Sequence, residues 1–131
     1  MLKGIGVDLV SIKRIEKIMD RHREKFLNRI MSEKELEHLR PRKFSPASIA
    51  ARFAAKEAVL KAIGCGIGPA ALKEVEITGA AGKAPGVTLY GFAARYATEK
   101  SIEQISLSMT HEPPFACAIA AATGSTEKGQ V

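Results

Sequence analysis

A long helical pattern from Pro46 to Ile63 constrains this chain more than any other feature of its sequence. Ser45 and Pro46 fit an N-cap followed by a first-turn proline, and Gly64 suits the position that ends a helix. On a helical wheel, the apolar stripe spans about 40° on either side of its centre, and it is formed by Ile49, Phe53, Leu60 and Ile63. The sequence therefore predicts one long, well-packed helix with many alanines.

Three charged residues interrupt the packed side of this helix. Lys56 falls inside the apolar stripe, Glu57 lies at its edge and Lys61 follows one turn beyond. Charges near a packed face are costly unless they are paired, bind a ligand or line a polar cavity. The alternative is structural: Lys56 extends its amine to solvent, and Glu57 and Lys61 form a surface pair.

The other predicted elements surround this helix. Leu2 to Val7 reads as a short strand that places Asp8 at its end, and Ser11 caps a helix from Ile12 to about Phe26. The later segments show typical capping, turn and alternation patterns, and they predict helices at 32–39 and 92–100, a hairpin at 75–78 and 87–90, and strands at 105–110 and 115–122. Between the last two strands we expect a loop with His111.

Irregular alternation of these elements indicates an α+β fold, in which a small antiparallel sheet packs against one long and several short helices. The length of 131 residues fits a single domain, and residues 124–131 read as a frayed tail.

The amino terminus lacks the pattern of a signal peptide, and no apolar run is long enough to cross a membrane. Cys65 and Cys117 lack metal-binding spacing, which favours reduced thiols in the cytoplasm.

Charge indicates an anionic partner. Lys and Arg number 20 against 14 Asp and Glu, for a net charge of +6. Aromatic residues make up only 5% of the chain and Trp is absent, which argues against stacking of single-stranded nucleic acid. A basic ridge is expected on the first helix, where Arg14, Lys17 and Arg21 share one face.

A metal and phosphate site is one interpretation of the charged residues. If the first strand packs beside the long helix, Asp8 and Glu57 converge, and two carboxylates with waters and phosphate oxygens suit Mg²⁺. The lysines then bind phosphates as point charges. The alternative is that Asp8 is a turn or cap residue. "GCGIG" after the helix is not a dinucleotide fingerprint, and "GKAP" is either an ordinary hairpin turn or a segment that presents Lys83 to an anion.

Two stretches together resemble the holo-acyl-carrier-protein synthase family of small bacterial phosphopantetheinyl transferases. They are "GIGVDLVSIKRI" near the amino terminus and "RFAAKEAVLKAIGCGIG" in the middle, and weaker similarity continues through "GKAP" and "SLSMTHEPPFACA". The resemblance implies Mg²⁺-dependent transfer of the phosphopantetheine arm of coenzyme A to a serine of apo acyl carrier protein, with release of adenosine 3',5'-bisphosphate. It also implies a role in fatty acid biosynthesis.

The resemblance assigns roles to individual residues. Asp8 and Glu57 match the Mg²⁺ ligands, and Lys61 matches the lysine that contacts the pyrophosphate. The remaining coenzyme-binding positions that it implies are Lys56, Gly64, Lys83 and His111. The base that takes the serine proton stays open among Glu35, Glu37, Glu57 and a metal-bound water.

Carrier docking and assembly are also implied by the family. Arg14 and Arg21 match positions that dock the acidic carrier, with Lys17, Arg23 and Lys25 adding electrostatic steering. The family implies a homotrimer with active sites between subunits. Two departures, the extra alanine in "GKAP" and the unusual "HEPP", affect Lys83 and His111. The rival hypotheses are a basic module that binds RNA or an anionic protein without catalysis, and another Mg²⁺-dependent phosphoryl or nucleotidyl transferase.

Overall fold

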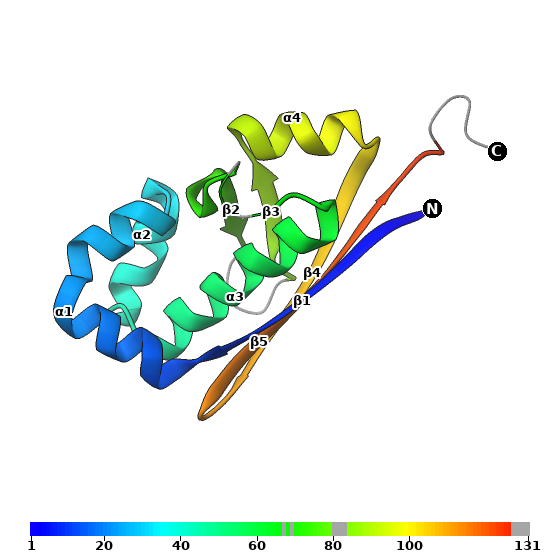
Figure 1. The fold of residues 1–131 in the computed structure, drawn as a ribbon. Coiled ribbons are helices and arrows are strands. Elements are labelled where there is room, and N and C mark those ends of the chain that lie inside the picture. Colours follow the sequence, from blue (N-terminus) through cyan, green and yellow to red (C-terminus); the bar gives the residue numbers. More distant parts are fainter. Residues whose placement is uncertain (67, 69, 80–83, 127–131) are drawn as a thin grey trace.

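The helices and a short hairpin lie on one side of a three-stranded antiparallel sheet (Figure 1). The structure is a computed structural model that describes residues 1–66, 68, 70–79 and 84–126. The sheet has the order β1-β5-β4, built from β1 (Leu2–Ser11), β4 (Ile102–Glu112) and β5 (Phe115–Gly124). This arrangement confirms the predicted α+β class. No helix among the described residues combines the length and the apolar character needed to cross a membrane.

The first strand is longer than predicted. β1 continues to Ser11, so Asp8 lies within the strand, opposite Ala118 of β5, and not at its end. The expectation of a strand end was wrong because Leu9 and Val10 continue the pairing with β5. Ser11 is the N-cap of the next helix as predicted, since its side chain accepts a hydrogen bond from the Arg14 amide.

That helix, α1 (Ile12–Ile30), also extends beyond the predicted end near Phe26. Leu27 and Ile30 are buried, so the apolar pattern continues for another turn. Non-helical backbone angles at His22 mark a kink within α1. After it, Ser32 and Glu35 form the predicted capping box of α2 (Glu33–Leu39), which leads into a short 3₁₀ turn, η1 (Arg40–Arg42).

The long helix has the predicted bounds. α3 (Pro46–Ile63) runs along the sheet (Figure 1) and ends at Gly64, which adopts the left-handed conformation with φ of 82°. Its alanines are buried against small residues of the sheet. Small side chains on both surfaces let helix and sheet approach closely, and this explains the alanine content.

The hairpin and the last helix lie beside α3. A 3₁₀ turn, η2 (Leu72–Glu74), precedes β2 (Val75–Thr78), which pairs with β3 (Gly86–Leu89), and α4 (Gly91–Glu99) follows. The predicted hairpin and helix are therefore confirmed to within one or two residues. Lys83 lies outside the described residues.

The last two strands exceed their predicted lengths, and this corrects the expectation for His111. β4 runs to Glu112, so His111 lies inside the strand, opposite Ala116 of β5, and not in a loop. The turn contains only Pro113 and Pro114. Gly124 ends β5, so the tail expected from 124 starts later; residues 127–131 lie outside the described part of the chain.

Candidate active site

Two glycines of β1 set the distance between strand and helix. A Cβ atom added to Gly4 would lie 2.0 Å from the Ala62 carbonyl oxygen, and one added to Gly6 would lie 1.9 Å from that of Ala58. No other residue fits so close to a helix backbone. Because alternate strand residues share a face, Asp8 points to the same side as these glycines, toward the preceding turns of α3.

At this position Asp8 meets two of the charged residues predicted for the site. The Lys61 amine donates hydrogen bonds to Asp8 Oδ1, at 3.2 Å, and to the Val7 carbonyl oxygen, at 3.0 Å. Burial raises the pKa of Glu57, and the Asp8 charge raises it further, together with a hydrogen bond between the two carboxyls that only a protonated form can make. Lys61 and Arg14 act in the opposite direction. The two carboxylates therefore converge as predicted.

The pairing of Lys61 with Asp8 differs from the surface pair that was the alternative in the sequence. The ion pairs of the described residues join Lys61 to Asp8 and not to Glu57. The Asp8 side chain is only 12% exposed, whereas that of Lys61 is 56% exposed. A largely buried carboxylate on the strand is thus paired with a lysine whose side chain is exposed to solvent.

One atom at this site lacks a partner. Asp8 Oδ2 is buried and accepts no hydrogen bond from the described residues. A buried carboxylate oxygen without a donor, next to a second carboxyl group, fits a cation better than any neutral ligand. The described part of the chain holds no group of three or more His, Cys, Asp or Glu that would form an all-protein metal site. A two-carboxylate site suits Mg²⁺, which retains waters and substrate oxygens as its other ligands.

Lys56 has a different environment from its neighbour Glu57. Its side chain is fully buried, and its amine donates hydrogen bonds to Glu35 Oε1, at 2.6 Å, and to the carbonyl oxygens of Leu72 and Val75. The structural alternative, in which Lys56 extends its amine to solvent, is therefore wrong. All three ammonium hydrogens have acceptors inside the protein, so a phosphate contact to Lys56 finds no support in its surroundings.

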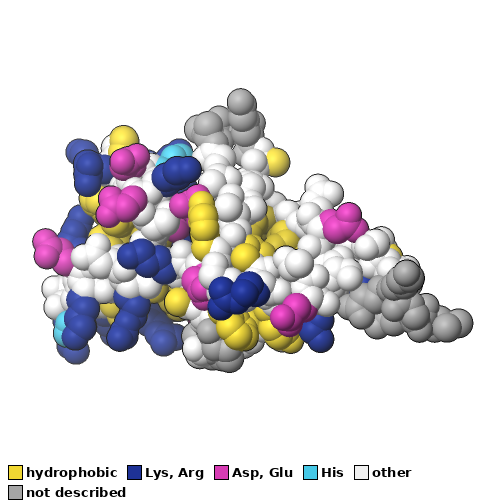
Figure 2. All heavy atoms as spheres, turned by 90° about the horizontal axis from the view of Figure 1, so that it is seen from above, with side chains coloured by type: hydrophobic (Ala, Val, Ile, Leu, Met, Phe, Trp, Pro, Cys, Tyr) yellow, Lys and Arg dark blue, Asp and Glu magenta, His cyan; other side chains and the backbone are white. Residues whose placement is uncertain are grey.

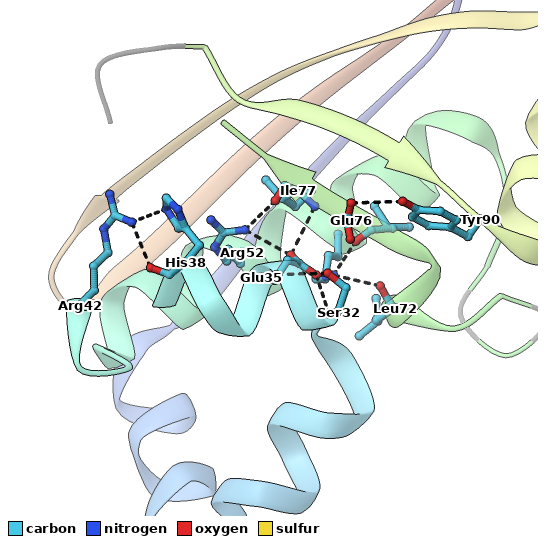
Figure 3. A network of polar contacts seen from close by, with 11 residues as sticks. Ser32, Glu35, His38, Arg42, Arg52, Leu72, Glu76, Ile77 and Tyr90 are labelled. Atoms are coloured by element: carbon cyan, nitrogen blue, oxygen red, sulfur yellow. Dashed lines mark hydrogen bonds and ion pairs between the residues drawn. The ribbon is translucent and has the colours of Figure 1, made fainter. Parts of the chain in front are cut away.

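Glu35 is the centre of this buried ion network. Its carboxylate accepts hydrogen bonds from Lys56, from Arg52 Nη1, and from the amides of Ser32 and Ile77 (Figure 3). The side chain is completely enclosed, so a substrate hydroxyl does not reach it. This location argues against Glu35 as the catalytic base. Glu37, on the same helix, is exposed.

His111 lines a cavity of about 150 Å³ on the other side of α3. The cationic and titratable residues around this cavity are His38, Arg42, Arg52 and His111. Burial lowers the pKa of His38, and the charges of Arg52 and Arg42 lower it further. Such a concentration of positive charge favours an anion. The sequence prediction missed Arg42 and Arg52, although Arg52 begins the most distinctive stretch of the chain.

The two groups of residues occupy opposite sides of α3. At 100° per residue, Arg52 lies about 140° from Glu57 and about 180° from Lys61 around the helix axis. The carboxylates face β1, at one edge of the sheet, whereas the cavity adjoins β4, at the other edge. Within one chain, α3 separates the carboxylates from the cationic cavity.

The end of α3 is held by a residue from α4. The amide of Gly64 donates to the carbonyl oxygens of Leu60 and Lys61, and its own carbonyl accepts a hydrogen bond from the Tyr96 hydroxyl at 3.1 Å. These contacts fix the last turn of α3, which carries Lys61. Local sequence patterns do not indicate this contact of Tyr96, because they do not relate α4 to the end of α3.

The predicted basic ridge is present on α1. Arg14, Lys17, Arg21 and Lys25 are exposed, and Figure 2 shows Lys and Arg side chains gathered at the end of the molecule that α1 and α2 form. The guanidinium of Arg23 lies 5.0 Å from the centre of the Phe44 ring and so packs against the protein. Near the kink, a cavity of about 280 Å³ has both apolar and cationic walls, formed by Ile18, His22, Lys25, Phe26 and Arg29.

Comparison with known proteins agrees with the resemblance in the sequence. Residues 4–120 match the family model of the 4'-phosphopantetheinyl transferase superfamily. A holo-[acyl-carrier-protein] synthase from Desulforudis audaxviator is 44% identical over 127 residues, covering 97% of both chains. One from Carboxydothermus hydrogenoformans is 42% identical over 115 residues, covering 87% of this chain and 92% of the relative.

Solved structures give the same result. The acyl carrier protein synthase of Plasmodium yoelii with ADP bound superposes with a TM-score of 0.87 at 31% identity, covering 96% of this chain and 98% of the other. The Helicobacter pylori holo-[acyl-carrier-protein] synthase in complex with coenzyme A has a TM-score of 0.79 at 36% identity, covering 91% and 99%. Sequence and fold agree over nearly the whole length, and the chain belongs to the holo-acyl-carrier-protein synthase family of the 4'-phosphopantetheinyl transferase superfamily.

Proposed function

We propose that this protein transfers the phosphopantetheine arm of coenzyme A to a serine of apo acyl carrier protein and releases adenosine 3',5'-bisphosphate. The observation that carries the proposal is the convergence of Asp8 and Glu57 beside Lys61, at the positions that the family resemblance singles out. Family membership supplies the donor and the acceptor: related structures contain coenzyme A, and the relatives are named for the acyl carrier protein.

The reaction exchanges one phosphorus–oxygen bond for another. The serine oxygen attacks the phosphorus that bears the pantetheine arm, the bond from this phosphorus to the bridging oxygen breaks, and the bisphosphate leaves with the bridging oxygen. Asp8 and Glu57 would hold Mg²⁺, which would supply positive charge to stabilise the charge that builds on the pyrophosphate oxygens. Lys61 lies next to Asp8, and its exposed side chain can swing onto the leaving phosphate.

The serine proton needs an acceptor near the carboxylates. Glu57 remains a candidate because its carboxyl group lies beside that of Asp8. Glu37 and a metal-bound water are the other candidates, and Glu35 is excluded by its burial. In the proposal, the cationic cavity with Arg52 and His111 takes an anionic part of the coenzyme, and Gly64 and Lys83 are further coenzyme positions.

The assembly that fits this arrangement is a homotrimer with shared active sites. Opposite sides of α3 carry the carboxylates and the cationic cavity, so a coenzyme bound to both spans two subunits more easily than one. The uncovered face of the sheet supports self-association, because large apolar side chains stand exposed on it: Ile5, Val7, Leu9, Phe115 and Ile119.

Carrier docking is proposed for the basic ridge of α1. Acyl carrier proteins are acidic, and Arg14 lies close enough to Glu57 for its charge to act on that carboxyl, so a partner on the ridge adjoins the reaction site. Arg21 extends the docking surface, and Lys17 and Lys25 add steering. Coenzyme A as the donor and two free cysteines fit a reducing compartment. We propose that the protein acts in the cytoplasm and takes part in fatty acid biosynthesis.

Intact-mass measurement tests the proposed transfer. The protein is mixed with Mg²⁺, coenzyme A and apo acyl carrier protein, and the mass of the carrier is expected to rise by one phosphopantetheine. A carrier whose acceptor serine is replaced by alanine is the control. If the mass stays unchanged while a known synthase modifies the same carrier in parallel, the protein is not this transferase, and a basic binding module becomes the better interpretation.

A further inference from the structure

The buried lysine next to the metal-site carboxylate has no assigned role in the reaction. Lys56 and Arg52 stand one turn apart on α3, and both contact the carboxylate of Glu35. Burial lowers the pKa of both cations, while Glu35 raises it. An arrangement that encloses two cations around one carboxylate is expensive to bury, so its geometry calls for an explanation.

The two cations divide the Glu35 carboxylate between them. Lys56 takes Oε1 at 2.6 Å, and the Ser32 amide donates to the same oxygen. Arg52 reaches only Oε2, through Nη1 at 3.3 Å, and that oxygen also accepts from the Ile77 amide. The same Nη1 donates to the Ile77 carbonyl at 2.8 Å (Figure 3).

Arginine and carboxylate ordinarily form a two-nitrogen, two-oxygen pair. Here the second oxygen is occupied, and the hydrogen bonds that the described residues receive from Arg52 all come from Nη1. Arg52 lines two cavities, one with Arg42 and His111 and one with Lys34 and Thr78. Its other nitrogens are thereby left for a ligand in these cavities.

We propose that Lys56 is a positioning residue for coenzyme binding, because its hold on one oxygen of Glu35 prevents a two-nitrogen pair between Glu35 and Arg52. Arg52 thus keeps part of its guanidinium available for an anion. The inference rests on the proposed function, in which the cationic cavity takes an anionic part of coenzyme A.

Electrostatics supports the same conclusion. The second buried carboxylate of the network, Glu76, accepts a hydrogen bond from the Tyr90 hydroxyl and acts on Lys56 by its charge. Removal of the Lys56 charge leaves Arg52 as the only cation that contacts Glu35 among the described residues, which draws the guanidinium toward that carboxylate and away from the cavities.

Binding of adenosine 3',5'-bisphosphate, measured by calorimetric titration of the full-length protein, tests the inference. Lys56→Met keeps the length of the side chain and is expected to raise Kd about 3- to 10-fold, as part of one charge-assisted contact is lost. Lys73→Met removes a charge from the exposed 3₁₀ turn η2 and is the matched control, with an unchanged Kd. Circular dichroism checks that each variant is folded.

Two further variants separate this mechanism from general damage. In an Arg52→Gln background, Lys56→Met is expected to change Kd no further, because Lys56 acts through Arg52. Glu35→Gln releases Arg52 and is expected to lower Kd, in the direction opposite to Lys56→Met. The direction of the Kd change in Glu35→Gln tests the positioning role of Lys56 even if Lys56→Met does not fold.

Several results overturn the inference. They are an unchanged Kd in Lys56→Met, an equal effect of Lys56→Met in the Arg52→Gln background, or an increase of Kd in Glu35→Gln. The transfer assay with the unmodified protein distinguishes the two proposals. If the unmodified protein is active but Lys56→Met leaves its Kd for the bisphosphate unchanged, only the positioning role is refuted. If the unmodified protein neither transfers phosphopantetheine nor binds the bisphosphate, both the proposed function and the inference are refuted.

Discussion

Two adjacent residues of α3, Lys56 and Glu57, point to different sides of the same helix. A rotation of 100° per residue turns Lys56 into the interior, where it joins the Glu35 network, and turns Glu57 toward Asp8 on β1. The lysine gains acceptors for all its hydrogens, while the carboxyl groups of Glu57 and Asp8 repel each other when both are ionised. The first arrangement satisfies the hydrogen-bonding groups of a buried lysine, and the second is the cation site that we propose.

Glu57→Gln is expected to lower kcat by at least about a hundredfold, since a neutral amide is a poor ligand for Mg²⁺. The loss of repulsion from Asp8 leaves the thermal stability of the apo protein unchanged or higher. Mg²⁺ is expected to raise the melting temperature of the unmodified protein and not that of the variant. Steady-state kinetics and thermal melts with and without Mg²⁺ check these outcomes.

Glu99→Gln, an exposed change at the end of α4, is the matched control and keeps normal activity. Activity of Glu57→Gln at the level of this control would remove Glu57 from the metal site.

At the scale of elements, contact between β1 and α3 decides whether the site exists. Gly4 and Gly6 lie directly against the backbone at Ala62 and Ala58, and this close packing carries Asp8 to the position where it meets Lys61. A Cβ atom at Gly6 would lie 1.9 Å from the Ala58 carbonyl oxygen and would force strand and helix apart. The positions of the carboxylates in the proposed metal site therefore depend on two glycines that have no part in the proposed chemistry.

Gly6→Ala is expected to lower the free energy of unfolding by about 1–3 kcal/mol or more, because its Cβ overlaps the Ala58 carbonyl oxygen and the packed core cannot yield fully. Gly66→Ala is the control, since a Cβ there meets no atom within 4 Å. Urea denaturation of both variants measures the difference. Equal stabilities would show that β1 can retreat from α3 at little cost.

Sequence patterns correctly predicted α3, its cap residues and the capping box of α2, because these depend on local spacing and on side chains within a few residues. They also brought Asp8 and Glu57 together as a hypothesis. They failed where distant segments decide the outcome. The extension of β1 through Asp8 requires pairing with β5, and the burial of Lys56 requires Glu35, which lies 21 residues away.

At the scale of the whole molecule, the fold divides the proposed site and leaves one sheet face uncovered. Asp8, Glu57 and Lys61 lie on the β1 side of α3, while Arg52 and His111 lie on the β4 side. A ring of identical subunits that meet through unlike surfaces brings these two sides together at every interface. The exposed apolar residues of β1 and β5 would contribute contact area to the ring that we propose.

Mixing of two inactive variants tests this shared site. Glu57→Gln damages only the carboxylate side and Arg52→Gln only the cavity side, so each homotrimer has a defect in all of its sites. Co-expression of the two variants in equal amounts is expected to produce mixed trimers. An intact site needs the carboxylate side of an Arg52→Gln chain and the cavity side of a Glu57→Gln chain, and random assembly in a ring places these together at about one quarter of the sites. The transfer rate is therefore expected to recover to about a quarter of the unmodified level, whereas two variants expressed apart and mixed without subunit exchange stay inactive. If each chain held a complete site of its own, co-expression would restore nothing, because every chain would still carry its own defect.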